Sequence, residues 1–81
     1  MPYISKLQRQ AIAAGDSANT PGQLNYVITE AIIGYMAGQD NNYSMINEVV
    51  GVLECAKLEL YRRIVIPYED RKIEENGDVY G

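Results

Sequence analysis

The C-terminal half of the chain constrains the fold most, because it carries helical periodicity without an internal stop. From Ile46 to Gly77, apolar side chains recur every three or four residues, which places them on one face of a helix. The residues of this face, called the apolar stripe below, are Ile46, Val49, Leu53, Ala56, Leu60 and Ile64. Three valines lie outside the stripe, at positions 50, 52 and 65. We therefore expect burial on more than one side of the helix, most simply by a second copy of the protein.

Capping and periodicity predict four helical segments, at residues 5–14, 21–37, 44–65 and 68–75. Ser5 and Ser44 are the expected caps of the first and third segments, and Thr20 with Gln23 forms a capping box for the second. Pro67 has no backbone N–H, so we expect a kink or break near residues 64–66. The expected fold class is all-α, a small helical bundle with one long kinked C-terminal helix, assembled as a homo-oligomer.

A chain of 81 residues predicts one domain with marginal stability. Its expected parts are an N-terminal helix and linker (1–20), a second helix (21–38), a long kinked helix (44–76) and a tail (77–81). The single cysteine, Cys55, cannot form a disulfide within the chain, and we expect it to be a small core residue. We expect no metal site and no cofactor, because the chain has no histidine and no cysteine cluster. Self-association is then the expected source of further burial.

The composition also limits the possible functions. The absence of histidine removes histidine-based acid–base catalysis, and we do not expect an enzyme. A net charge of −4 argues against binding of long nucleic acids, but it permits a small anion held by a few local cations. No segment has the length and hydropathy of a signal peptide or a membrane span, so we expect no membrane partner and a cytoplasmic location.

The densest cationic feature is the tripeptide Tyr61-Arg62-Arg63. Arginine binds phosphate through two parallel hydrogen bonds, and tyrosine stacks on bases, so the cluster predicts a nucleotide pocket assembled from two or more subunits. Its further candidate residues are Lys57, Tyr68, Arg71 and Lys72. The alternative is an ordinary solvated helix surface, in which Glu59 pairs with Arg63 and Glu54 with Lys57.

A second candidate anion site is the start of the helix at residues 21–37. Free backbone N–H groups at a helix N-terminus favour an anion, and Asn25 and Tyr26 are polar groups close to this end. The alternative is an ordinary capped helix start.

Two segments of the chain, residues 22–29 (GQLNYVIT) and 46–80, resemble a family of short proteins encoded by tailed bacteriophages and prophages. That family has no established activity, so the resemblance assigns no catalytic residue. It implies a viral gene product that acts in the cytoplasm of a bacterial host. A looser analogy in size and helicity links the chain to small phage homo-oligomers that sequester the cyclic nucleotides of bacterial defence systems.

The leading functional hypothesis is therefore a non-enzymatic phage counter-defence protein. It would bind a small nucleotide immune signal, such as a cyclic oligonucleotide, between the subunits of a homo-oligomer. One alternative is an acidic inhibitor that binds a host or CRISPR defence protein. Another is a structural or assembly accessory of the phage particle.

Overall fold

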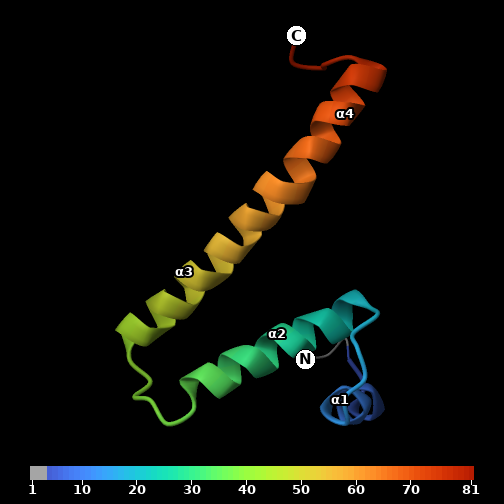
Figure 1. Ribbon diagram of the computed structural model, residues 1–81. Coiled ribbons are helices and arrows are strands. Elements are labelled where there is room, and N and C mark those ends of the chain that lie inside the picture. Colours follow the sequence, from blue (N-terminus) through green and yellow to red (C-terminus); the bar gives the residue numbers. More distant parts are fainter. Residues whose placement is uncertain (1–3) are drawn as a thin grey trace. The chain divides into compact units, whose positions relative to one another are not determined.

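The chain is all-α in the computed structural model, which describes residues 4–81 (Figure 1). Its helices are α1 (Lys6–Ala13), α2 (Pro21–Met36), α3 (Tyr43–Leu60) and α4 (Ile66–Asn76), with a π-helical turn, η1 (Tyr61–Val65), between α3 and α4. No strand occurs in the described part of the chain, so the predicted all-α class is confirmed. The first three residues of the predicted N-terminal segment lie outside the described residues.

The chain divides into two compact units, Met1–Asn41 and Asn42–Gly81. In the first unit, α1 begins with the predicted serine cap. The backbone N–H of Gln8 donates to Ser5 Oγ over 3.1 Å, and the backbone N–H of Ser5 donates to Gln8 Oε1 over 3.1 Å. This reciprocal pair satisfies two N–H groups that the first turn leaves without helical partners.

Helix α2 starts at the predicted Thr20 cap, with Pro21 at its first position. The backbone N–H of Gln23 donates to Thr20 Oγ1 over 3.2 Å. The return bond of the expected capping box is different, because Gln23 Oε1 accepts from the backbone N–H of Asn19 over 2.8 Å. After the end of α2, Gly38 adopts a φ of 78°, a left-handed conformation that glycine tolerates without a Cβ clash.

In the second unit, α3 begins one residue before the predicted start at 44. Asn42, and not Ser44, is the N-cap, and its Oδ1 accepts from the backbone N–H of Met45 over 2.8 Å. Asparagine and serine are comparable caps, so the sequence alone does not decide between two candidates this close together.

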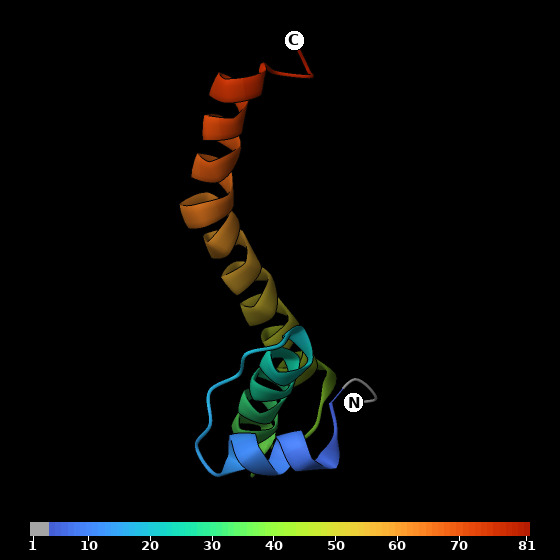
Figure 2. The same cartoon turned by 90° about the vertical axis from the view of Figure 1, so that its right-hand side faces the viewer.

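Helices α3 and α4 form one continuous helix through η1, which confirms a single long C-terminal helix. The expected interruption before Pro67 is the π-helical turn, in which the N–H of Ile66 donates to the carbonyl of Tyr61. Pro67 cannot donate to the carbonyl of Arg63, and its ring crowds the preceding turn, so a wider turn accommodates it. The ribbon changes direction in this region (Figure 2). The separate helices expected at 44–65 and 68–75 are therefore parts of one helix.

Few side chains are buried. Among residues 4–81, only Ile4 and Met45 belong to the buried apolar class, at 5% and 4% exposure. No described side chain is fully buried. A folded chain normally buries most of its large apolar side chains. In the single chain many of them stay exposed, as is typical of a surface that a partner covers.

Candidate binding surfaces

The first candidate surface is the apolar stripe of the long helix. Most of its branched side chains are exposed, with Leu60 at 51% and Ile64 at 62%, whereas Val49 is half-buried. In a regular α-helix, four residues make slightly more than one turn, so side chains spaced four apart move gradually around the helix axis. A π-helical turn holds more residues per turn, which reverses this movement. Because η1 lies between Leu60 and Tyr68, it keeps the stripe and Tyr68 close to one face.

A second face of α3 is polar. Its residues Glu48, Cys55 and Glu59 follow one another at helical spacing and lie about a third of a turn away from the stripe. Cys55 is exposed, so the expectation of a core cysteine is wrong for the single chain. Leu53 and Leu60 of the stripe are also exposed, so the exposure of Cys55 follows from the sparse packing of α3 in the single chain and not from its register.

The three residues of the Tyr61-Arg62-Arg63 motif all fall in η1. Arg63 Nε donates to Glu59 Oε1 over 2.7 Å, so this arginine has the intrahelical partner expected of a solvated helix surface. Arg62 has no ion pair or side-chain hydrogen bond with any described residue. Consecutive helical residues point in different directions, so Tyr61 and Arg62 do not converge on one ligand within a single copy.

Lys57 also has an intrahelical partner. Its Nζ lies 3.4 Å from Glu54 Oε1, and both side chains are well exposed. This pair and the Glu59–Arg63 pair match the solvated-surface alternative at two positions. Exposed pairs of this kind contribute at most about 1 kcal/mol each, so a stronger anion could displace them.

The helix α4 brings three of the candidate residues together. Arg71 Cζ lies 6.0 Å and Lys72 Nζ 5.6 Å from the centroid of the Tyr68 ring. Lys72 Nζ also lies 3.2 Å from Glu75 Oε2. The three- and four-residue spacings from Tyr68 are the sequence signal for this cluster.

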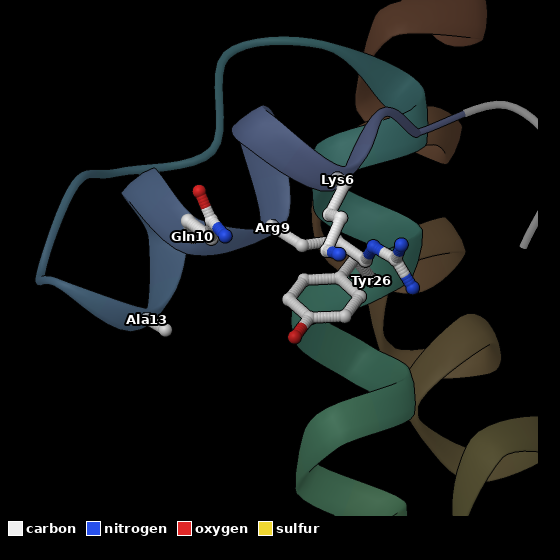
Figure 3. A pocket seen from close by; sticks show the side chains of 5 residues that line it. All are labelled: Lys6, Arg9, Gln10, Ala13 and Tyr26. Carbon is white, nitrogen blue, oxygen red and sulfur yellow. The ribbon is translucent and has the colours of Figure 1, made fainter.

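The first unit contains a pocket between α1 and α2. Its volume is about 300 Å³, and five residues line it: Lys6, Arg9, Gln10, Ala13 and Tyr26. Figure 3 shows the Lys6 and Arg9 side chains reaching toward the Tyr26 ring, while the Tyr26 hydroxyl points away from both cations. The sequence singled out Tyr26 but not its α1 partners. Residues 6, 9, 10 and 13 share one helical face by their spacing, but that spacing does not indicate which face of α1 meets α2.

Asn25, the other candidate of α2, does not line this pocket. Its backbone carbonyl accepts from Thr29 Oγ1 over 2.8 Å, and its Oδ1 accepts from the same hydroxyl over 3.5 Å. The structure therefore places Asn25 in local helix contacts and Tyr26 in the pocket.

Partial burial raises the pKa of the Tyr26 phenol above its ordinary value. The hydrogen bond to Glu30 and the charge of that carboxylate raise the pKa further, whereas the charge of Arg9 lowers it. The phenol is thus neutral at neutral pH and donates to Glu30, so the cations of the pocket face an aromatic ring and not a phenolate.

Residues 4–81 also lack the features of a metal site and of a membrane-spanning helix. They contain no group of three or more histidine, cysteine, aspartate or glutamate side chains placed to hold a metal ion. None of the helices in this range is both long and apolar enough to span a membrane.

Comparison with known proteins identifies a family. The model of the family DUF6899, a domain of unknown function, matches residues 1–79. Neither the curated proteins nor the solved structures contain a match to the chain.

Proposed function

The chain belongs to the DUF6899 family, and from its own surface we propose that it is a non-enzymatic binding protein that works as a homo-oligomer. The observation that carries this proposal is the exposed apolar stripe along the long helix. Exposed apolar patches of this extent are typical of interaction sites and rare on monomeric proteins. Other copies of the same helix are the proposed occupant of the stripe.

Two arguments favour a second copy over an unrelated partner. With two buried apolar side chains among residues 4–81, the single chain falls far short of the burial that normally stabilises a domain. Its folding then depends on a partner that is present whenever the chain is made, and another copy meets that condition. The stripe is also self-complementary in composition, since it is aliphatic throughout.

We further propose that the oligomer binds a small nucleotide, with a counter-defence role in a phage-infected bacterial cytoplasm. The resemblance to phage proteins supports the setting. Arg62 supports the ligand, because it is a cation without a carboxylate partner among the described residues. In an oligomer, Arg62 of one copy and Tyr61 or Tyr68 of another would meet the phosphates and the base.

Calorimetry with a panel of cyclic di- and trinucleotides tests this ligand. We expect Arg62→Ala to abolish the heat of binding and to leave the oligomer intact. Arg62→Lys should restore binding only in part, because lysine lacks the planar fork of arginine. An assembled protein that gives no heat with any member of the panel would reject the nucleotide ligand and leave self-association standing.

The second candidate function is an acidic inhibitor of a host protein. It rests on the C-terminal tail, where Val79 and Tyr80 are 95% and 98% exposed beside a run of acidic residues. An exposed aromatic group within an acidic segment suits docking on a basic protein surface. Deletion of residues 78–81 separates the candidates, because it would abolish inhibition by the tail but preserve nucleotide binding by Arg62.

A further inference from the structure

We propose that the pocket between α1 and α2 binds a small phosphate ester with a planar group, such as a nucleoside monophosphate. Lys6 and Arg9 would hold the phosphate, and the ring of Tyr26 would contact the planar group (Figure 3). This site lies within the first unit of one copy, so it needs neither the apolar stripe nor Arg62.

The charges of the pocket support an anionic ligand. Lys6 and Arg9 have no ion pair with any carboxylate among residues 4–81. The whole chain has 11 acidic and 7 basic residues. In a chain with this excess of acidic residues, two neighbouring cations without acidic partners are unexpected. The carboxylate of Glu30 accepts a hydrogen bond from the Tyr26 hydroxyl. A bound phosphate would relieve the repulsion between the two cations.

The geometry brings both cations to one place. Lys6, Arg9, Gln10 and Ala13 occupy successive positions on one face of α1, which turns them toward α2. The methyl group of Ala13 leaves space at the far end of the pocket, and the Gln10 amide supplies a donor and an acceptor. Tyr26 closes the α2 side, and the phenol donates outward to Glu30, so its ring stays available to the ligand.

The chemistry of these groups favours phosphate over a simple carboxylate. The guanidinium of Arg9 matches two phosphate oxygens, and Lys6 adds a second positive charge for a dianion. A volume of about 300 Å³ stands at the lower end of small-molecule sites, which suits a mononucleotide better than a cyclic dinucleotide. The aromatic ring would add affinity for a base beyond that for inorganic phosphate.

Residue-resolved NMR titration of the full chain with adenosine monophosphate, adenosine and inorganic phosphate tests this proposal. We expect adenosine monophosphate to shift the amide signals of α1 and of Tyr26, with an affinity at least about tenfold higher than either fragment. Equal affinity for inorganic phosphate would overturn the role of the Tyr26 ring. Shifts confined to residues 61–72, or no shifts at all, would overturn the pocket; the former would favour the Arg62 site instead.

Variants assign the contacts. Arg9→Ala and, independently, Lys6→Ala should each weaken binding by about tenfold or more, because each removes a charge-assisted hydrogen bond. Tyr26→Phe should bind as the parent does, since the hydroxyl points away from the cations, whereas Tyr26→Leu should bind more weakly. Asn47→Asp is the matched control: it lowers the net charge by the same amount as Arg9→Ala, at an exposed position of α3. An equal loss of affinity in the control would show that net charge, and not the pocket, governs binding.

Discussion

The backbone N–H of Ile66 donates to the carbonyl of Tyr61, five residues earlier and one more than in an α-helix. This bond places a wide turn immediately before Pro67, where a regular helix would leave the carbonyl of Arg63 without its donor. The turn also sets the rotation of α4 about the helix axis relative to α3. It therefore determines which α4 residues continue the apolar stripe.

Replacement of that proline tests the role of the wide turn. Pro67→Ala restores a donor for the carbonyl of Arg63, so we expect four-residue bonding and a helix more stable by up to about 3 kcal/mol. The same change rotates Tyr68 away from the stripe and should weaken self-association. Circular dichroism at 222 nm and sedimentation equilibrium measure the two effects.

Pro21→Ala, at the first position of α2, is the control and should leave assembly unchanged. Unaltered assembly of Pro67→Ala would show that the rotation of α4 is unimportant.

Two leucines of α3 offer a matched test of the stripe. Leu60 lies on it and Leu58 lies nearly opposite, yet their exposures are similar, at 51% and 56%. Leu60→Asp should dissociate and unfold the protein together, at a cost above about 3 kcal/mol per copy, because the interface would bury an unpaired carboxylate. Leu53→Asp should do the same, whereas Leu58→Asp should preserve the oligomer. Light scattering and thermal melting report both outcomes; equal effects at Leu58 and Leu60 would mean that the stripe is not the interface.

The single cysteine reports on the polar face of the same helix. Cys55 is exposed in the single chain and lies off the stripe, so its thiol should react with a disulfide reagent as fast in the native oligomer as in denaturant. Ala56→Cys in a Cys55→Ser background places the thiol on the stripe and should be protected. Protection of Cys55 in the native state would show that this face is also covered.

The pH response of Tyr26 tests the geometry of the first unit. Because its pKa is raised in the fold, the contribution of Tyr26 to stability is complete below pH about 10, the ordinary tyrosine value, and is lost as the pH rises through the folded pKa. Glu30→Gln should lower this pKa, since it removes a carboxylate that opposes the phenolate. Arg9→Ala should raise it further, since it removes a favourable cation. Carbon-13 NMR of labelled tyrosine, assigned with Tyr26→Phe, follows the titration. A pKa insensitive to Arg9→Ala would show that this arginine does not face Tyr26.

The sequence predicted well those features that depend on local chemistry. The Ser5 and Thr20 caps and the Glu59–Arg63 pair all rest on residues within four positions of each other. The interruption of the regular helix before Pro67 also depends on local chemistry and was predicted. The kind of interruption, a π-helical turn, was not. A break and a π-helical turn both relieve the clash of the proline ring, and periodicity does not distinguish them.

Features that depend on packing between helices were beyond the sequence. The pocket joins Lys6 and Arg9 of α1 to Tyr26 of α2, and helical spacing says nothing about which α1 face meets α2. Cys55 was expected to be a small core residue, but it is exposed, because the single chain leaves most of α3 uncovered. The nucleotide site at Arg62 stays a prediction, since its proposed partners belong to another copy.

The central claim is that the stripe of one copy is covered by others, and the mass of the native protein tests it most directly. Native mass spectrometry and sedimentation equilibrium at micromolar concentration should give a whole multiple of the 9.1 kDa chain. The same protein should unfold at higher temperature as its concentration rises, because folding and association are coupled. A stable, folded species of 9.1 kDa across this concentration range would contradict the account.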